Sequence, residues 1–403
     1  MFRRFTWALG LLLAVAACTS STSSIDDPTS SSTDDATTTS TSSTDSIVGP
    51  GRLVVVDGDG DIVALDPDGS NRTPITDDAG DTAIYSQPIW SLDGASLAWG
   101  QVTPDGFAVG IRSVEAGAST TIETPHLPFY MHWAPDNHKI GILHNGSAGL
   151  DFAMVDVTEA TSTVVDSGSP FYFSWSPDSD RIVTHVGPER FEIVEPDGAR
   201  ERAGSTSSNY LAPQWTPAGI FHVDDGFLVV DQVDGERRQV VEVGVFTTFV
   251  VNTQGTQVAV QSTGGTPAIS VGLVDVVAVP SEVVVVVDVA TGESEVVTQR
   301  PALGFFWSPN GESLLLMTPT GEGMQATVWG VGGDKTDYEE FRPSVFLVRD
   351  MFPFFPQYAQ SLSYWSPDST AFTYAADDGI WVQQLDSDIS NKISDGTWVA
   401  WSR

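Results

Sequence analysis

This sequence of 403 residues is poor in cysteine and in basic residues. Its one cysteine, Cys18, cannot form a disulfide within the chain, so packing must stabilise any folded part. Lysine and arginine number 18 against 53 aspartates and glutamates, which gives a formal net charge of −35. Because a surface of that sign repels nucleic acids and anionic headgroups, no nucleic-acid partner is expected.

The common catalytic and cofactor motifs are also missing. The sequence has no Gly-x-Ser-x-Gly nucleophile elbow, no glycine-rich phosphate loop and no His/Glu metalloprotease pair. No stretch shows a convincing helical period, which predicts an all-β domain. We therefore predict no cofactor and assign no catalytic residue, although scattered carboxylates can still gather into a site in the folded protein.

The first 18 residues have the pattern of a bacterial export signal. Arg3 and Arg4 precede an apolar run that is too short for a comfortable membrane span, and small residues lead to Cys18. The stretch "VAAC" at 15–18 resembles the lipobox of bacterial lipoproteins. That resemblance implies a signal peptide at 1–17 and an acylated Cys18 as the mature N-terminus. An incidental cysteine in an ordinary secretory signal is the alternative.

Residues 18–47 consist almost entirely of serine, threonine and aspartate after the cysteine. Such a segment has too little apolar surface to offset the entropy of ordering it. We predict a disordered tether with a root-mean-square reach on the order of 30 Å. The protein would then be exported and held to the lipid bilayer through Cys18, on the cell surface or the periplasmic side.

A repeat of about 40 residues fills the rest of the chain, 48–403. Each copy has a tryptophan at the end of an apolar strand, a Ser-Pro-Asp type turn and further alternating strands, as in "FSWSPDSDRIVTH" (173–185). Four antiparallel strands at this period are typical of a β-propeller blade. Val251 replaces the tryptophan in one degraded copy, and the others carry Trp90, Trp133, Trp175, Trp215, Trp307, Trp365 and Trp401.

These copies resemble the WSPDG repeats of the TolB-type propeller family, which also occur in the propeller domains of dipeptidyl-peptidase-like enzymes. The resemblance covers roughly residues 52–403 and implies a β-propeller fold. It is a weak guide to function, because propellers host binding scaffolds, lectins and enzymes alike.

The two ends of the repeat region complement each other. Residues 52–76 supply three strands without a tryptophan strand, and "GTWVAWSR" at 396–403 is a tryptophan strand without the other three. Their pairing would close the ring and remove two free sheet edges. We predict eight four-stranded blades, or seven if the Val251 copy is not a true blade.

Three further patterns have ordinary structural explanations. The repeated tryptophans hold one place in every blade, so packing between blades is expected. The stretch "DGDGD" at 57–61 lacks the glycine and glutamate that a calcium loop requires, which favours a hairpin turn. Four histidines fall at every sixth residue from 126 to 144. A hairpin about Pro135 would place His132 opposite His138, and the first histidine opposite the last. No carboxylate or cysteine completes a metal site among His126, His132, His138 and His144.

Aromatic residues precede the motif tryptophan in several blades, where the inner strand begins. If that strand end opens at the channel, they would form a rim suited to sugars or peptide side chains. Ordinary packing between blades is the alternative. The candidate contacts are Tyr85, Tyr130, Tyr172 and Tyr210.

Two insertions interrupt the repeat, near 264–281 and 341–360. The second, "FRPSVFLVRDMFPFFPQYAQ", is apolar and carries two arginines in an otherwise acidic protein. A loop of this kind either caps the propeller or meets a partner. Its candidate contacts are Arg342, Arg349, Phe352, Phe354 and Phe355.

Together these patterns favour a lipoprotein whose monomeric propeller binds or scaffolds an unidentified protein or glycan. The alternative is an extracytoplasmic hydrolase or lyase that acts on a glycan or peptide in the channel. Clustered carboxylates with raised pKa at one mouth of the ring would favour the enzyme. An aromatic, apolar rim without such a cluster would favour binding.

Overall fold

The computed structural model describes residues 51–403 except 115–116, 148, 189, 196–197, 205–210, 233–234, 245 and 264–282. Cys18, the segments 1–17 and 18–47, Tyr210 and the insertion near 264–281 therefore lie outside the described residues. Among the described residues, no helix is both long and apolar enough to cross a bilayer.

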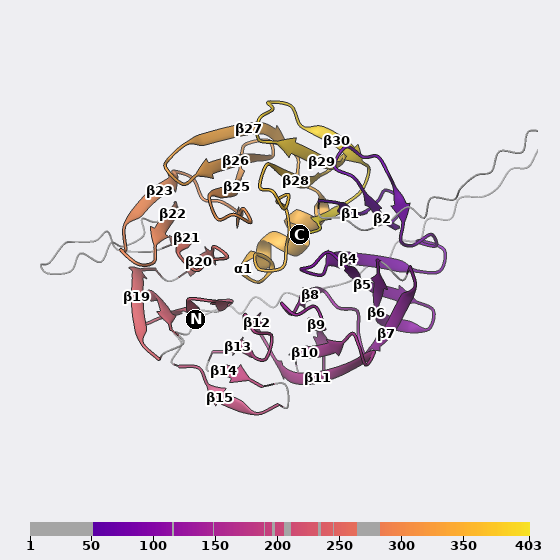
Figure 1. Cartoon of the computed structure of the whole chain (residues 1–403), viewed down its shortest axis with the longest axis horizontal. Coiled ribbons are helices and arrows are strands. Elements are labelled where there is room, and N and C mark those ends of the chain that lie inside the picture. Colours follow the sequence, from indigo (N-terminus) through magenta and orange to yellow (C-terminus); the bar gives the residue numbers. More distant parts are fainter. Residues whose placement is uncertain are drawn as a thin grey trace, which may run out of the picture. The chain divides into compact units, whose positions relative to one another are not determined.

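The alternating apolar runs fold into eight antiparallel sheets, which stand around a ring as the blades of a propeller (Figure 1). Seven sheets have four strands, and the eighth has three, because Trp365 holds its inner position through a single bridge to Phe372. The prediction of eight blades is confirmed. The degraded copy around Val251 forms a complete blade of its own.

Each blade runs from an inner strand beside the channel to an outer strand at the rim. The inner strands are β31 (Trp398–Trp401), β4 (Ile84–Trp90), β8 (Tyr130–Trp133), β12 (Phe171–Trp175), β16 (Gln214–Thr216), β20 (Phe246–Val251) and β24 (Gly304–Trp307). The second strands are β1 (Leu53–Val56), β5 (Ser96–Thr103), β9 (Lys139–Gly146), β13 (Ile182–Val186), β17 (Gly219–Asp224), β21 (Gln257–Thr263), β25 (Ser313–Pro319) and β28 (Ala371–Ala376).

The third strands lie farther from the channel. They are β2 (Ile62–Leu65), β6 (Gly106–Ser113), β10 (Gly149–Asp156), β14 (Arg190–Val194), β18 (Phe227–Asp231), β22 (Val284–Asp288), β26 (Met324–Gly330) and β29 (Gly379–Gln384). The outer strands are β3 (Thr73–Pro74), β7 (Ser119–Thr124), β11 (Thr161–Gly168), β15 (Arg200–Arg202), β19 (Arg237–Glu242), β23 (Ser294–Thr298), β27 (Lys335–Phe341) and β30 (Asn391–Ser394).

The ring closes as the sequence predicts. Strand β31 pairs antiparallel with β1, with Leu53 opposite Trp401 and Val56 opposite Trp398. The backbone N–H of Ser402 donates to the carbonyl oxygen of Arg52 at 2.7 Å. The C-terminal strand thus becomes the inner strand of the blade that begins at β1, and β1 is not left as a free edge beside the channel.

The motif tryptophans join neighbouring blades, as predicted. In four blades the indole N–H donates to the backbone carbonyl just before the motif position of the preceding blade, at 2.9–3.4 Å. Gln214 takes over this role where Val251 replaces tryptophan, because its amide bonds both the Phe249 carbonyl and the Val251 N–H. The donors in the regular contacts are Trp133, Trp175, Trp307 and Trp365.

The turn after each tryptophan adds a second link between blades. Asn137, Ser179 and Ser369 stand where other copies have glycine, and all three have positive φ, between 61° and 65°. Their side chains accept hydrogen bonds from backbone N–H groups in the preceding blade's turn. The left-handed backbone conformation normally favours glycine, and this hydrogen bond offsets the cost of placing a residue with a side chain there.

The predicted pairing of His132 with His138 is wrong. His132 lies opposite Gly141 in the β8–β9 hairpin, because the turn centres between Asp136 and Asn137 rather than on Pro135. The rings of His126 and His144 do lie together, with centroids 6.0 Å apart. In the described residues no group of three or more His, Cys, Asp or Glu is placed to hold a metal ion.

The stretch at 57–61 is a hairpin turn, as predicted. One carboxylate oxygen of Asp57 accepts the backbone N–H groups of Asp59 and Asp61, each at 3.1 Å. The aspartate therefore orders the loop between β1 and β2 through local hydrogen bonds.

The insertion at 341–360 contains short helical turns that the sequence did not reveal. They are the π-helical turn η1 (Leu347–Met351), the 3₁₀ turn η2 (Phe352–Phe354) and the α-helical turn α1 (Phe355–Tyr358). Turns of three to five residues are too short to leave a helical period in the sequence.

Candidate functional site

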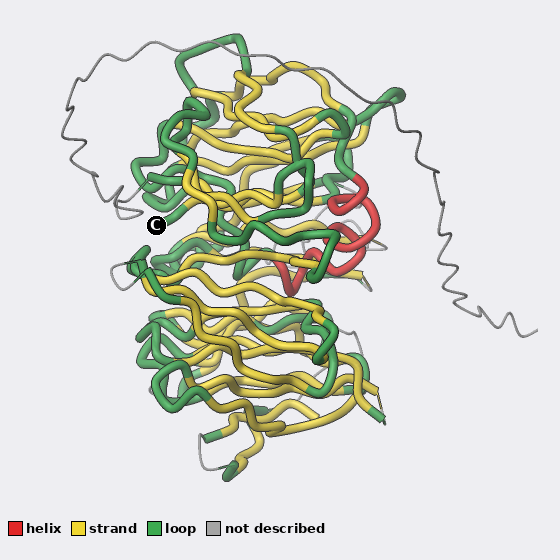
Figure 2. Tube along the Cα trace, turned by 90° about the vertical axis from the view of Figure 1, so that its right-hand side faces the viewer, coloured by secondary structure: helices red, strands yellow, loops and turns green. Residues whose placement is uncertain are grey.

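The helical insertion closes one end of the channel. Figure 1 places α1 inside the ring, and Figure 2 shows the helical turns at one face and the C-terminal residue at the other. Phe355 packs against Phe305 and Phe306 of β24, with ring centroids 5.0 and 5.3 Å apart. Phe346 packs against Trp398 of β31 at 4.4 Å. We call this the closed end, where the inner strands begin.

Polar contacts at the closed end are nearly all internal. The buried amide of Gln357 bonds both the N–H and the carbonyl of Phe173, at 3.1 and 3.0 Å. The hydroxyl of Tyr130 donates to the Gln357 carbonyl at 3.1 Å, and the Tyr358 hydroxyl bonds the Phe129 carbonyl. The insertion therefore caps the inner strands through satisfied hydrogen bonds and aromatic packing, which leaves little free surface inside this end.

The open end, where the inner strands finish at their tryptophans, contains a cavity of about 610 Å³. We call it the channel cavity. Rings from successive copies of the motif line it: Trp133, Trp175, Trp215, Trp307 and Trp365, with Pro135, Pro177, Pro217, Pro309 and Pro367. Trp215 and Trp307 are only half-buried. The motif tryptophans therefore pack between blades and also present ring surface to the channel.

The lining of the channel cavity contains no aspartate or glutamate, although the protein is strongly acidic. Its ionisable members are His132, Tyr364 and Arg403. Burial, and then the charge of Arg403, lower the pKa of His132 to about 3, so this imidazole is neutral. Arg403 is exposed overall, yet the surrounding protein lowers the pKa of its guanidinium. The one cation of the cavity lining thus faces a channel free of acidic side chains.

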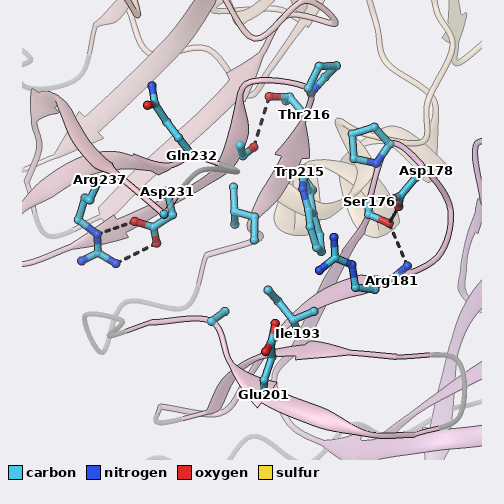
Figure 3. A pocket seen from close by; sticks show the side chains of 16 residues that line it. Ser176, Asp178, Arg181, Ile193, Glu201, Trp215, Thr216, Asp231, Gln232 and Arg237 are labelled. Carbon is cyan, nitrogen blue, oxygen red and sulfur yellow. Dashed lines mark hydrogen bonds and ion pairs between the residues drawn. The ribbon is translucent and has the colours of Figure 1, made fainter.

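A second hollow, the inter-blade groove, lies between the β12–β15 and β16–β19 blades and has a volume of about 620 Å³ (Figure 3). Trp215 lines both this groove and the channel cavity. The guanidinium of Arg181 lies over the Trp215 ring, 5.2 Å from its centroid. Such a cation–π contact fixes the indole plane between the two hollows.

An ion-pair cluster borders the inter-blade groove. Arg237 bonds both carboxylate oxygens of Asp231, at 2.6 and 2.9 Å, as Figure 3 shows. His222 contacts the same carboxylate at 2.7 Å. Burial raises the pKa of Asp231, but the bonds from His222 and Arg237 outweigh it, and the pKa falls to about 2. This carboxylate is therefore ionised and already paired.

The predicted rim tyrosines do not share one environment. Tyr130 is buried under α1, and burial raises its pKa to about 12. Tyr85 is half-buried and bonds the Asp78 carboxylate, whereas the half-buried Tyr172 has no side-chain hydrogen bond among the described residues. All three lie toward the closed end, where the inner strands begin, and Tyr210 lies outside the described residues.

The predicted contacts of the insertion divide into buried and exposed residues. Phe355 is buried and Phe352 half-buried, both close to Gly304 of β24. Phe354 is 55% exposed, and the Arg349 side chain is 74% exposed and paired with Asp350 at 2.8 Å. Arg342 is also exposed. The insertion thus has an inward apolar side that seals the channel and an outward side that carries the arginines.

Sequence reasoning missed the open-end residues. Arg403 follows the last motif copy, and no local pattern marks it as a channel residue. The motif prolines were interpreted only as turn residues, although their repetition at one place in each blade was a usable signal. Residues that hold equivalent places in a closed ring meet around its axis.

No protein-family model and no curated protein matches this sequence. Solved structures share its fold. A eukaryotic initiation factor aligns with a TM-score of 0.55 at 12% identity, over 88% of this chain and 98% of that one. An oligogalacturonate lyase in complex with manganese aligns with a TM-score of 0.52 at 13% identity, over 84% and 99%.

TolB from Acinetobacter baumannii is also among the similar structures, with a TM-score of 0.41 at 15% identity. The alignment covers 72% of this chain, which spans 65% of the length of TolB. At these identities the likeness shows the fold alone: this protein is an eight-bladed β-propeller.

Proposed function

We propose that this protein is an extracytoplasmic lipoprotein, anchored through Cys18, whose propeller binds a ligand in the channel cavity. The observation that supports binding is the composition of the open end: tryptophan and proline rings surround a space of about 610 Å³ whose lining has one arginine and no acidic side chain. Pockets of roughly 300–1,000 Å³ with such linings bury most of a small ligand's surface. The export signal and lipobox support the anchor.

Clustered carboxylates with raised pKa at one mouth of the ring would favour the enzyme alternative. In the described part of the chain, the carboxyl groups whose pKa departs from its ordinary value all have it lowered, as Asp178 and Asp231 do beside the inter-blade groove. A paired, fully ionised carboxylate is a poor general acid. The likeness to an oligogalacturonate lyase is one of fold, and the lining of the channel supports binding.

Binding in the channel is tested with the neutral aromatic dye N-phenyl-1-naphthylamine. Its fluorescence rises when it enters an apolar site, and we expect saturable binding to the full-length protein. Ala359→Trp, which adds a large ring to the cavity lining, should abolish that binding. Ala118→Trp in an exposed loop is the matched control and should leave it unchanged. Equal binding by the wild type and Ala359→Trp would refute the channel as the site.

Anchoring is tested separately by Cys18→Ser. This change removes the acylation site, and the protein should move from the membrane fraction to the soluble fraction after cell lysis. Retention in the membrane fraction would contradict the lipid anchor but would not affect the channel proposal.

A further inference from the structure

A second, much smaller cavity lies directly beside the channel cavity. It measures about 20 Å³ and lies where β4, β8 and β31 meet residues 360–363. Because a void of about 10–15 Å³ already holds one water, this inner cavity has room for one water-sized polar group. Arg403 and His132 line both the inner cavity and the channel cavity, so the two spaces are neighbours.

Buried N–H groups without partners surround the inner cavity. Trp90 and Trp401 line it, and these residues are 7% and 2% exposed. Their indole nitrogens have no hydrogen-bond partner, unlike those of Trp133 and Trp175, which donate to backbone carbonyls. The Nδ1 atom of His132 is also buried without a partner. Buried donors are normally satisfied, so the two unpaired indoles of residues that line this void are available to an acceptor group of a ligand.

The positive charge at this place is also unpaired. Arg403 forms no ion pair or hydrogen bond with any residue that the structure describes, and no acidic side chain lines either cavity. The sequence has 53 aspartate and glutamate residues, yet none of those that the structure describes forms an ion pair with the Arg403 guanidinium. An arginine at the mouth of a channel lined by tryptophan and proline rings is suited to an anionic group, which it binds with two parallel N–H bonds.

The other residues that line the channel cavity indicate the chemistry of the rest of the ligand. The amide of Gln214 is engaged by Phe249 and Val251, and that of Asn252 by its own turn. Thr253 and Gln360 likewise donate to backbone carbonyls. The hydroxyls of Ser363 and Tyr364 are then the main polar groups left for the many hydroxyls of a sugar. Rings of tryptophan and proline favour an apolar body instead.

We propose that the channel binds an apolar carboxylate: the carboxylate reaches the inner cavity and accepts hydrogen bonds from Arg403, Trp90 and Trp401, while the apolar body packs on the rings of the channel cavity. This assignment rests on the proposed function. A free organic acid and the C-terminus of an apolar peptide share this chemistry.

The test compares 4-phenylbutyrate with its neutral analogue 4-phenylbutyramide, by quenching of tryptophan fluorescence in the full-length protein. We expect the acid to bind at least about tenfold more tightly, as for a charge-assisted hydrogen bond. Arg403→Gln should bring the ratio of affinities close to one. Arg349→Gln makes the same charge change at the opposite face and should leave the ratio unchanged.

A second pair of variants separates binding from stability. Trp90→Phe removes an unpaired N–H, so it should lower the preference for the acid. Trp99 lines neither cavity, and Trp99→Phe removes an N–H that donates to Gln101 Oε1, so it should lower the melting temperature and leave the preference unchanged. A second comparison uses acetyl-Ala-Phe as the free acid and as the amide. Tighter binding of 4-phenylbutyrate than of acetyl-Ala-Phe would indicate a free organic acid, and the reverse order would indicate the C-terminus of a peptide.

The outcomes are distinct. Equal affinities for acid and amide, or a preference that survives Arg403→Gln, would overturn the carboxylate assignment and leave the channel as a binding site. Absence of saturable binding by every probe, including N-phenyl-1-naphthylamine, would overturn the proposed function as well.

Discussion

The two ends of the channel are built from the same inner strands but differ in how their polar groups are satisfied. At the closed end, Gln357, Tyr130 and Tyr358 bond backbone groups of the surrounding blades. At the open end, Trp90, Trp401 and Arg403 have donors without partners among the described residues.

This difference separates the surface that stabilises the fold from the surface that we propose binds the ligand. A protein gains stability by satisfying buried donors, so the closed end has the chemistry of a core. Unpaired donors at a cavity cost stability unless a ligand or water fills them. The aromatic residues at the closed end and the motif tryptophans at the open end therefore have different roles, although both sets line the same ring.

The largest effect is expected from removing the strand that both ends share. Deleting residues 396–403 removes β31 and leaves β1 with an open edge. Because Trp398 and Trp401 are both buried, the melting temperature should fall by more than about 10 °C, as followed by circular dichroism. Deleting Arg403 alone is the control and should leave the melting temperature nearly unchanged. An unchanged transition after the longer deletion would contradict ring closure.

The next effect tests the inward and outward sides of the insertion. Phe355→Ala creates a void against β24 and should lower the free energy of unfolding by about 3–5 kcal/mol. Phe354→Ala changes an exposed ring and should stay within about 0.5 kcal/mol. Urea denaturation measures both. If Phe354→Ala were the more damaging change, the insertion would not seal the channel as the structure shows.

Two tyrosines from the beginning of inner strands give a smaller contrast. Tyr130→Phe removes the bond to the Gln357 carbonyl and should cost about 1 kcal/mol of unfolding free energy. Tyr172→Phe removes no hydrogen bond among the described residues and should cost close to nothing. Neither change should alter dye binding at the open end, and a loss of dye binding in Tyr130→Phe would place the ligand at the closed end instead.

The smallest effect is a dependence on pH beside the open end. The pKa of Asp231 is lowered from 3.8 to about 2, so its ionised form stabilises the fold. That contribution is present above about pH 4 and is lost as the pH falls toward about 2. After screening by solvent it amounts to less than about 1 kcal/mol. Asp231→Asn should flatten the unfolding free energy over this range relative to the wild type, and an identical acid profile would contradict the pairing with His222 and Arg237.

The fold was predictable because its signal is repeated. Six tryptophan copies with the same turn and the same alternation reinforce one another, so the weak copy at Val251 is identified by its spacing. The closing strand was predictable for the same reason, since an unpaired motif at 396–403 matches three strands that lack one. The His132 register was missed because one residue in a turn shifts every pair in a hairpin, and composition does not fix that residue.

The site was much less predictable. Tyr130 and Phe355 were chosen as contacts because they are aromatic, yet the same apolar surface that suits a ligand also suits the inside of a plug. Helical turns as short as η1, η2 and α1 leave no period, so nothing in the insertion indicated which of its side chains face inward.

The sequence by itself indicated a closed propeller, with eight blades predicted and seven as the alternative, and the strand that closes it, because local strand and turn preferences recur at a fixed spacing. It also supplied the rings that line the channel. Only the tertiary structure decided which end of the channel is sealed and which residues of distant blades meet at the other. Arg403 and Trp90 are 313 positions apart, and their meeting at one cavity depends on ring closure, which no local pattern records.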